Sequence, residues 1–93
     1  MPQPLKERKD RFARMFPPRV EKAIKQFQLI SNCSNPSDYA YKDTTVAKVW
    51  VHLLLAMKAA AKEFGLDVEF TINNKRLDEL YVPGTIEKLV KGK

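Results

Sequence analysis

The sequence predicts a small, mainly helical α+β domain: an antiparallel helical hairpin with an N-terminal helix, a short β-hairpin after the long helix and a C-terminal helical turn. Two observations carry this prediction. Apolar residues recur at helical spacing up to Phe64, and the period changes to two directly after Gly65. At 93 residues and 44% hydrophobic residues, the chain is expected to form one domain, residues 1–93, around a modest core.

The longest predicted helix runs from Asp43 to Gly65 and organises the rest. Asp43 or Thr44 is expected to be its N-cap, and Gly65 is placed as the C′ glycine that closes the last turn. Its apolar residues lie at i, i+3, i+4 and i+7 spacing, so we expect this stripe to form the core. The stripe consists of Val46, Val49, Trp50, Leu53, Leu54, Met57, Ala60, Ala61 and Phe64.

Two shorter helices are predicted before it. The first, residues 5–16, is expected to end at Pro17-Pro18, because a residue before proline avoids the helical region. The second is expected over about residues 19–31. Pro18 is placed at its start, where a missing N–H is tolerated, and turn-forming residues occupy 32–38. We therefore expect residues 17–64 to form the helical hairpin and residues 1–16 to form a basic N-terminal arm.

Beyond Gly65 the pattern indicates strands. Val68, Phe70 and Ile72 alternate with polar residues, and Asn73-Asn74-Lys75 predicts the turn of a β-hairpin over residues 66–82. The second strand is expected from Arg76 to Val82. Pro83-Gly84 then predicts a turn, and Thr85 is expected to cap a terminal helix over residues 85–91.

The charge is unevenly distributed. The chain carries a net charge of +6, and residues 1–19 hold six lysines and arginines against two acidic residues. A basic arm favours an acidic partner such as nucleic acid, although a solvated helix surface gives the same pattern. The predicted nucleic-acid-binding residues are Lys6, Arg8, Arg11 and Arg14 in the arm, with Lys48 and Lys62 on the long helix.

A protein interface is the alternative function. Val51 and Leu55 lie opposite the predicted core stripe, and a helix that is apolar on both sides is usually covered on both. Either the N-terminal helix or a second copy of the chain is expected to cover Leu55. Together with Leu29 and the strand edge at Phe70, these two residues predict a homo-oligomer or a protein-binding module such as an inhibitor or assembly factor.

Catalytic and metal chemistry are not expected. The chain has a single cysteine, Cys33, and a single histidine, His52, and it contains no glycine-rich phosphate loop. We therefore expect a non-enzymatic protein without cofactor or metal. The apolar run 49–57 is interrupted by His52, and the N-terminal residues are charged, so a cytoplasmic location without membrane contact is expected.

One sequence resemblance covers residues 16–64. Arg19-Val20-Glu21-Lys22, the segment Leu29–Asn35 that contains Asn32-Cys33-Ser34-Asn35, and Tyr39 with Tyr41 resemble an RVxK…NCSN…YxY two-helix core. This core occurs in small proteins of phages and integrative or conjugative elements. The resemblance implies an accessory role in a mobile genetic element and transfers no site residues. Thr44-Thr45 stands where such proteins commonly carry acidic residues, and the strand region is unmatched.

Overall fold

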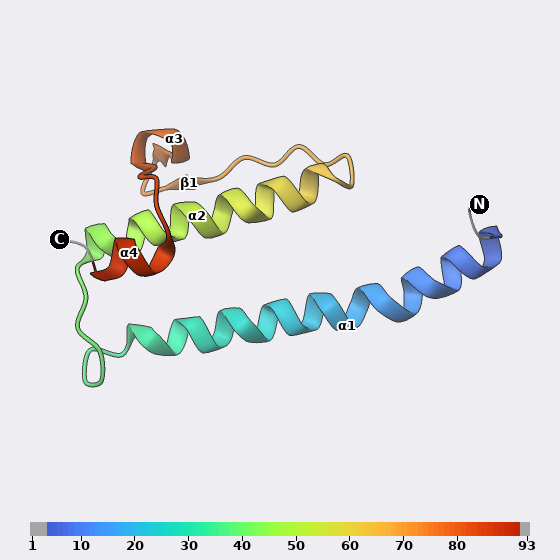
Figure 1. The fold of residues 1–93 in the computed structure, drawn as a ribbon, viewed down its shortest axis with the longest axis horizontal. Helices are drawn as coiled ribbons and strands as arrows, with labels where there is room; N and C mark the ends of the chain where they lie inside the picture. The colour runs from blue at the N-terminus through green and yellow to red at the C-terminus, as the bar shows by residue number, and fades with distance from the viewer. Residues whose placement is uncertain (1–3, 92–93) are drawn as a thin grey trace. The chain divides into compact units, whose positions relative to one another are not determined.

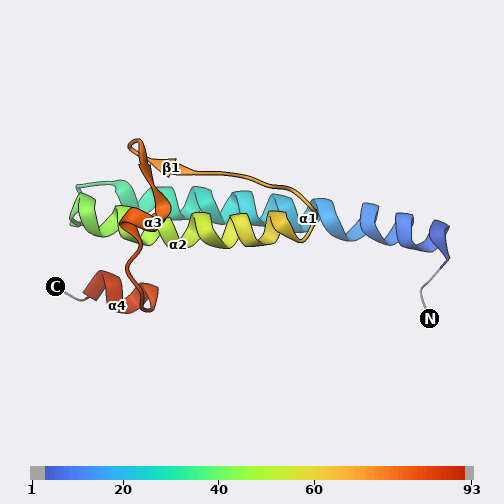
Figure 2. The same ribbon diagram turned by 90° about the horizontal axis from the view of Figure 1, so that it is seen from above.

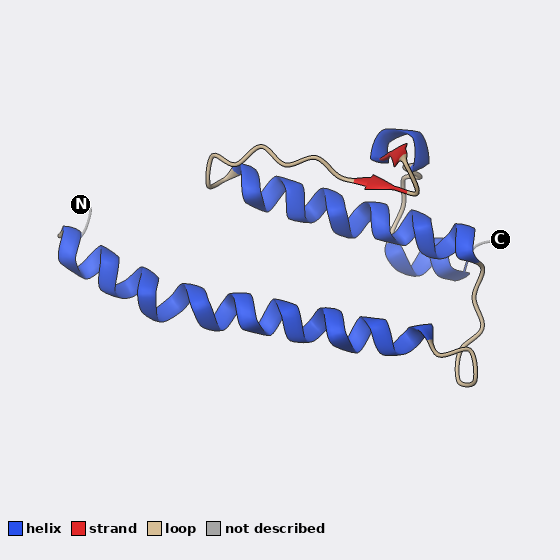
Figure 3. Cartoon of the chain, turned by 180° about the vertical axis from the view of Figure 1, so that it is seen from behind, coloured by secondary structure: helices blue, strands red, loops and turns tan. Residues whose placement is uncertain are grey.

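A computed structural model describes residues 4–91 of the chain and divides it into two compact units, Met1–Ala40 and Tyr41–Lys93. The elements follow in the order α1, η1, α2, β1, β2, α3 and α4. Helices dominate, with a single two-stranded antiparallel sheet among the described residues (Figure 3). The predicted mainly helical α+β class is confirmed. The prediction that residues 1–93 form one domain stays a prediction.

The first unit consists of one long helix and a turn. Helix α1 spans Leu5–Ser31 without a break and contains Pro17 and Pro18 (Figure 1). The predicted end of a first helix at residue 16 is therefore wrong. The physical reason is that the apolar residues keep the same position on the helix across the prolines. Phe12, Phe16 and Val20 are four residues apart, so they form one continuous stripe. Proline also has a φ near the helical value, although it lacks an N–H donor.

The end of α1 matches the prediction for residues 32–38. The 3₁₀ turn η1, Asn32–Ser34, follows the helix directly. The Ser37 N–H donates to Asn35 Oδ1 at 3.0 Å, and Asn35 Nδ2 donates to Asp38 Oδ2 at 3.1 Å. An asparagine side chain that accepts from the backbone two residues on is a typical turn-forming interaction.

The second unit is built on α2, Asp43–Lys62. Lys42 occupies the N-cap position and makes no side-chain cap hydrogen bond, so the prediction of a cap at Asp43 or Thr44 is wrong. Asp43 lies instead in the first turn, where its negative charge is favourable beside the exposed N–H groups. At the other end Gly65 has φ +78°, and the Leu66 N–H donates to the Ala61 carbonyl at 3.1 Å. This is the Schellman geometry predicted from the glycine.

After α2 an extended segment runs back along the helix to a short hairpin (Figures 1 and 2). Strand β1, Thr71–Ile72, pairs with β2, Lys75–Arg76. Asn73 and Asn74 have φ values of +52° and +66°, as a type I′ turn requires. The hairpin is confirmed, but it is shorter than the predicted range 66–82.

The predicted second strand is replaced beyond Arg76 by a helical turn. Helix α3, Leu77–Leu80, begins where the Arg76 N–H donates to Glu79 Oε2 at 3.3 Å. A glutamate three residues after the N-cap is a helix-start signal, and it overrides the strand pattern here. Helix α4, Ile86–Lys91, begins as predicted, with the Lys88 N–H donating to Thr85 Oγ1 at 3.1 Å.

The core of the second unit lies on the side of α2 that the sequence assigned to the surface. Val51 is completely buried and Leu77 is 7% exposed, because α3 and α4 pack against α2. In contrast, Met57 is 41% and Phe64 60% exposed, so their placement in the core is wrong. Trp50 is half-buried in a shallow hollow between α2 and β1.

Truncating Val51 tests this core. Val51→Ala should lower the free energy of unfolding by about 2 kcal/mol, because it removes two buried methyl groups and leaves a small cavity. Urea unfolding followed by Trp50 fluorescence measures the change. Val90→Ala removes the same atoms from an exposed side chain and is the matched control. Equal effects of the two variants would contradict the assignment of Val51 as the centre of the core.

The continuity of α1 is tested by replacing its prolines. Each interior proline destabilises a helix by about 3 kcal/mol relative to alanine. Pro17→Ala combined with Pro18→Ala should therefore leave the circular dichroism of the helix at 222 nm nearly unchanged at low temperature and delay its thermal loss. Pro36→Ala, in the turn after η1, should leave both unchanged. A large gain in the low-temperature signal over this control would mean that the chain is broken at residues 17–18.

Candidate nucleic-acid interface

Helix α1 carries two distinct faces. At 3.6 residues per turn, the apolar residues gather on one side, and the cationic residues gather on a second side roughly 140° around the helix. We call the second set the basic face; it consists of Arg8, Arg11, Arg14, Arg19, Lys22 and Lys25. All six side chains are exposed. They lie in two runs with a spacing of three residues, one before and one after the prolines.

Nearby carboxylates do not neutralise most of this basic face. Within residues 4–91, no carboxylate lies within ion-pair distance of Arg11, Arg14, Arg19, Lys22 or Lys25. The ion pairs of Lys58, Arg76 and Lys91 all belong to the second unit. Helix α1 contains eight cationic residues against Glu7, Asp10 and Glu21, which gives it most of the net positive charge of the chain.

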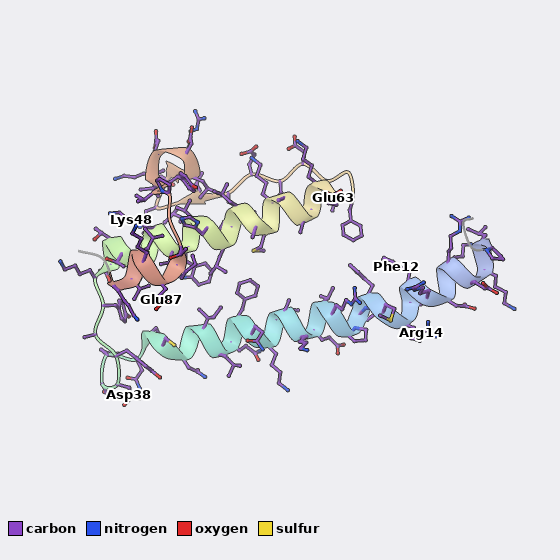
Figure 4. All side chains as sticks on the ribbon, viewed as in Figure 1. Phe12, Arg14, Asp38, Lys48, Glu63 and Glu87 are labelled. Carbon is purple, nitrogen blue, oxygen red and sulfur yellow. The ribbon has the colours of Figure 1, made fainter. Side chains whose placement is uncertain are left out.

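The first turns of α1 hold a shallow depression at the edge of the basic face. It is lined by Glu7, Asp10, Arg11, Arg14 and Met15. Two carboxylates beside two guanidinium groups lower the local positive potential, so the basic face is strongest away from this depression. Figure 4 labels Arg14 and Phe12, which represent the basic and apolar sides of the helix.

The residues that the sequence proposed for nucleic-acid binding lie on two different helices. Arg8, Arg11 and Arg14 share the basic face, whereas Lys6 lies near the edge of the apolar side of α1. Lys48 and Lys62 belong to α2 in the second unit, about 21 Å apart along the helix. Lys62 ends α2, where a positive charge stabilises the exposed carbonyl groups.

His52 is partly buried within the second unit. Its Nε2–H donates to the Val82 carbonyl at 2.8 Å, and its ring lies 5.1 Å from that of Tyr81. This hydrogen bond is partly buried and links α2 to the segment between α3 and α4. His52 therefore has a structural role in the second unit.

The predicted interface residues differ in how deeply they are buried. Val51 is buried beneath α3 and α4, so it is not accessible to a partner, and its prediction as an interface residue is wrong. Leu55 and Phe70 are half-buried. Leu29 remains 55% exposed, and at helical spacing it falls in line with Arg11 and Lys22 on the basic face.

The remaining chemistry-bearing residues do not form a site. Cys33 is a free, exposed thiol in η1. No group of three or more histidine, cysteine, aspartate or glutamate residues that could hold a metal ion occurs within residues 4–91. The described side chains thus offer charge and surface rather than a reactive constellation.

By length and composition alone, α2 could cross a membrane, which is weak evidence by itself. Only a small share of the helix is buried in the structure. The same helix contains Lys58, whose Nζ lies 3.0 Å from Glu69 Oε1, as well as the hydrogen-bonded His52. Both side chains connect the following segment to α2 by polar interactions.

No family model, curated protein or solved structure matches the chain.

Sequence reasoning missed half of the basic face. Arg19, Lys22 and Lys25 were assigned to a separate helix, because the prolines were expected to end the first one. Their common spacing of three residues, in phase with Arg8 and Arg11 across residues 17–18, was the signal that could have found them.

The link between α2 and the C-terminal segment can be tested at His52. His52→Ala should lower the free energy of unfolding of the second unit by about 1–2 kcal/mol, because the Val82 carbonyl loses its donor. Urea unfolding followed by Trp50 fluorescence provides the measurement. His52→Gln retains a donor and should recover part of the loss. An Ala variant as stable as the parent would show that the hydrogen bond contributes nothing.

Proposed function

We propose that this protein is a non-enzymatic accessory protein that binds nucleic acid through the basic face of α1. The observation that carries the proposal is the exposure of six cationic side chains on one side of one helix. Electrostatic attraction between such a surface and phosphates supplies most of the affinity in sequence-independent binding.

The dimensions of the basic face suit a phosphate backbone. Arg8 and Lys25 are 17 residues apart, which is about 26 Å along a helix. Successive phosphates of one strand rise about 3.4 Å along the duplex axis, so the basic face covers roughly seven or eight base pairs. Arginine, which supplies four of the six cations, also makes bidentate contacts to phosphate.

The composition of the basic face favours backbone contact over base recognition. Its residues are long, flexible and all cationic, so phosphate charge is the feature that every one of them can contact. Binding is therefore expected to depend weakly on base sequence and strongly on salt. The resemblance to small proteins of phages and integrative elements supports an accessory role next to nucleic acid in such an element.

The test removes charge without removing the helix. Arg11→Gln, Lys22→Gln and Lys25→Gln combined should weaken binding to a 20-base-pair duplex about 10- to 100-fold at 50 mM salt. The slope of log affinity against log salt should fall by roughly 3, since each lost phosphate contact contributes about 0.9. Fluorescence anisotropy over a salt series, with duplex DNA, single-stranded DNA and RNA in parallel, measures both quantities.

The control removes the same charge from the second unit. Lys42→Gln, Lys75→Gln and Lys88→Gln combined alter exposed lysines outside α1 and should preserve the slope. Lys48→Gln with Lys62→Gln tests the two α2 residues separately. The proposal is wrong if the parent protein binds none of the three nucleic acids at 50 mM salt, or if the control weakens binding as much as the α1 variant.

A further inference from the structure

The six cationic residues of the basic face form two rows of three. The first row is Arg8, Arg11 and Arg14, and the second row is Arg19, Lys22 and Lys25. Each member of the second row follows its counterpart in the first row by 11 residues. Eleven residues make about three turns, so counterparts point in the same direction to within about 20° and lie about 16 Å apart along the helix.

An uncharged strip separates the two rows. Residues 15–18, which read Met-Phe-Pro-Pro, contain no charged side chain. Met15 and Pro18 fall on the same side of the helix as the cations, at 100° per residue. The basic face therefore has two cationic borders and an uncharged centre.

We propose that α1 lies across the major groove of double-stranded DNA, with one row on each of the two strands that border the groove. This rests on the proposed function, because it names the substrate class of the same face. The major groove is about 12 Å wide and the minor groove about 6 Å. A separation of about 16 Å places the rows just outside the edges of the major groove, over the phosphates, whereas it is far too large for the minor groove.

The two-row pattern gives no advantage on other nucleic acids. A single strand presents one line of phosphates, and the uncharged residues 15–18 would interrupt a helix that follows this line. Double-stranded RNA has a deep and narrow major groove, whose bordering strands do not match the separation of the rows. A DNA duplex offers two phosphate lines at the required distance.

Arg11 and Lys22 are expected to contribute most to this contact. They stand in the middle of their rows, they are exposed, and within the described part of α1 neither has a carboxylate within ion-pair distance. The acidic residues of α1 lie toward the other edge of the basic face, near Arg14 and Lys25. They are Glu7, Asp10 and Glu21.

A comparison of nucleic acids tests the substrate class. Fluorescence anisotropy at 50 mM salt should show that the protein binds a 20-base-pair DNA duplex at least about 10-fold more tightly than a single strand of the same sequence or an RNA duplex. Equal affinity for the DNA duplex and either of the others would overturn the proposal and leave the proposed function in place. Binding to none of the three would overturn both.

Two variants with equal loss of charge test the rows. Arg11→Gln with Arg14→Gln removes two cations from the first row, so the preference for the duplex over the single strand should fall below about 2-fold. Arg11→Gln with Lys22→Gln removes one cation from each row, and it should weaken binding to every nucleic acid while the preference remains. Equal effects of the two variants on this preference would overturn the proposal.

An insertion tests the register of the rows without any change of charge. Two alanines between Met15 and Phe16 turn the second row by about 160° relative to the first, so the preference for the duplex should be lost. The same two alanines between Gln28 and Leu29 lie beyond the second row and should preserve it. Circular dichroism at 222 nm checks that both variants keep the helix. A preference that survives the first insertion in a helical protein would contradict contact with both strands.

Discussion

The second unit depends on the burial of Val51 beneath the short helices that follow the hairpin. Helices α3 and α4 have four and six residues, and helices of this length are not stable alone in water. Their stability must come from packing on α2, where Val51 and Leu77 form the buried centre. The His52–Val82 hydrogen bond and the Lys58–Glu69 ion pair hold the connecting segments against the same helix. The ion pair is exposed and contributes little, so the apolar centre and the partly buried hydrogen bond dominate.

Helix α1 differs from the second unit in its burial and its charge. It buries none of its residues, it contains two prolines, and it carries most of the net charge. The prolines also remove two backbone hydrogen bonds from the helix. Its sequence nevertheless keeps both the apolar and the basic residues in phase over about five turns. The regular spacing of the cations is the feature on which the proposed phosphate contacts depend.

The sequence predicted those parts of the fold that depend on local chemistry. Gly65 at the end of α2, the Asn73-Asn74 turn and the Thr85 cap each act through a few neighbouring atoms, and each is found as expected. The failures required knowledge of packing. Two sides of α2 are apolar, and periodicity cannot show which of them α3 and α4 will cover. The sequence therefore predicts Val51 as an interface residue and Phe64 as a core residue, and both predictions are wrong.

The sequence alone predicts only part of the candidate site, because the rest depends on the fold. Arg8, Arg11 and Arg14 were evident as a basic cluster, because charge can be read without a fold. The rest of the basic face was hidden by a rule about prolines that holds for most helices, and that the continuous stripe from Phe12 to Ile30 overrides here. Local propensity is a weak prior when a long amphipathic pattern opposes it.

The basic face depends on the continuity of α1 through its prolines. Arg14 and Arg19 lie on either side of residues 17–18, so the two runs of cations share one face only while the helix is unbroken. A phosphate backbone that contacts both runs therefore offsets part of the cost of ordering the helix at the prolines. Salt screens these contacts, so the gain in helix stability on binding nucleic acid should shrink as the salt concentration rises.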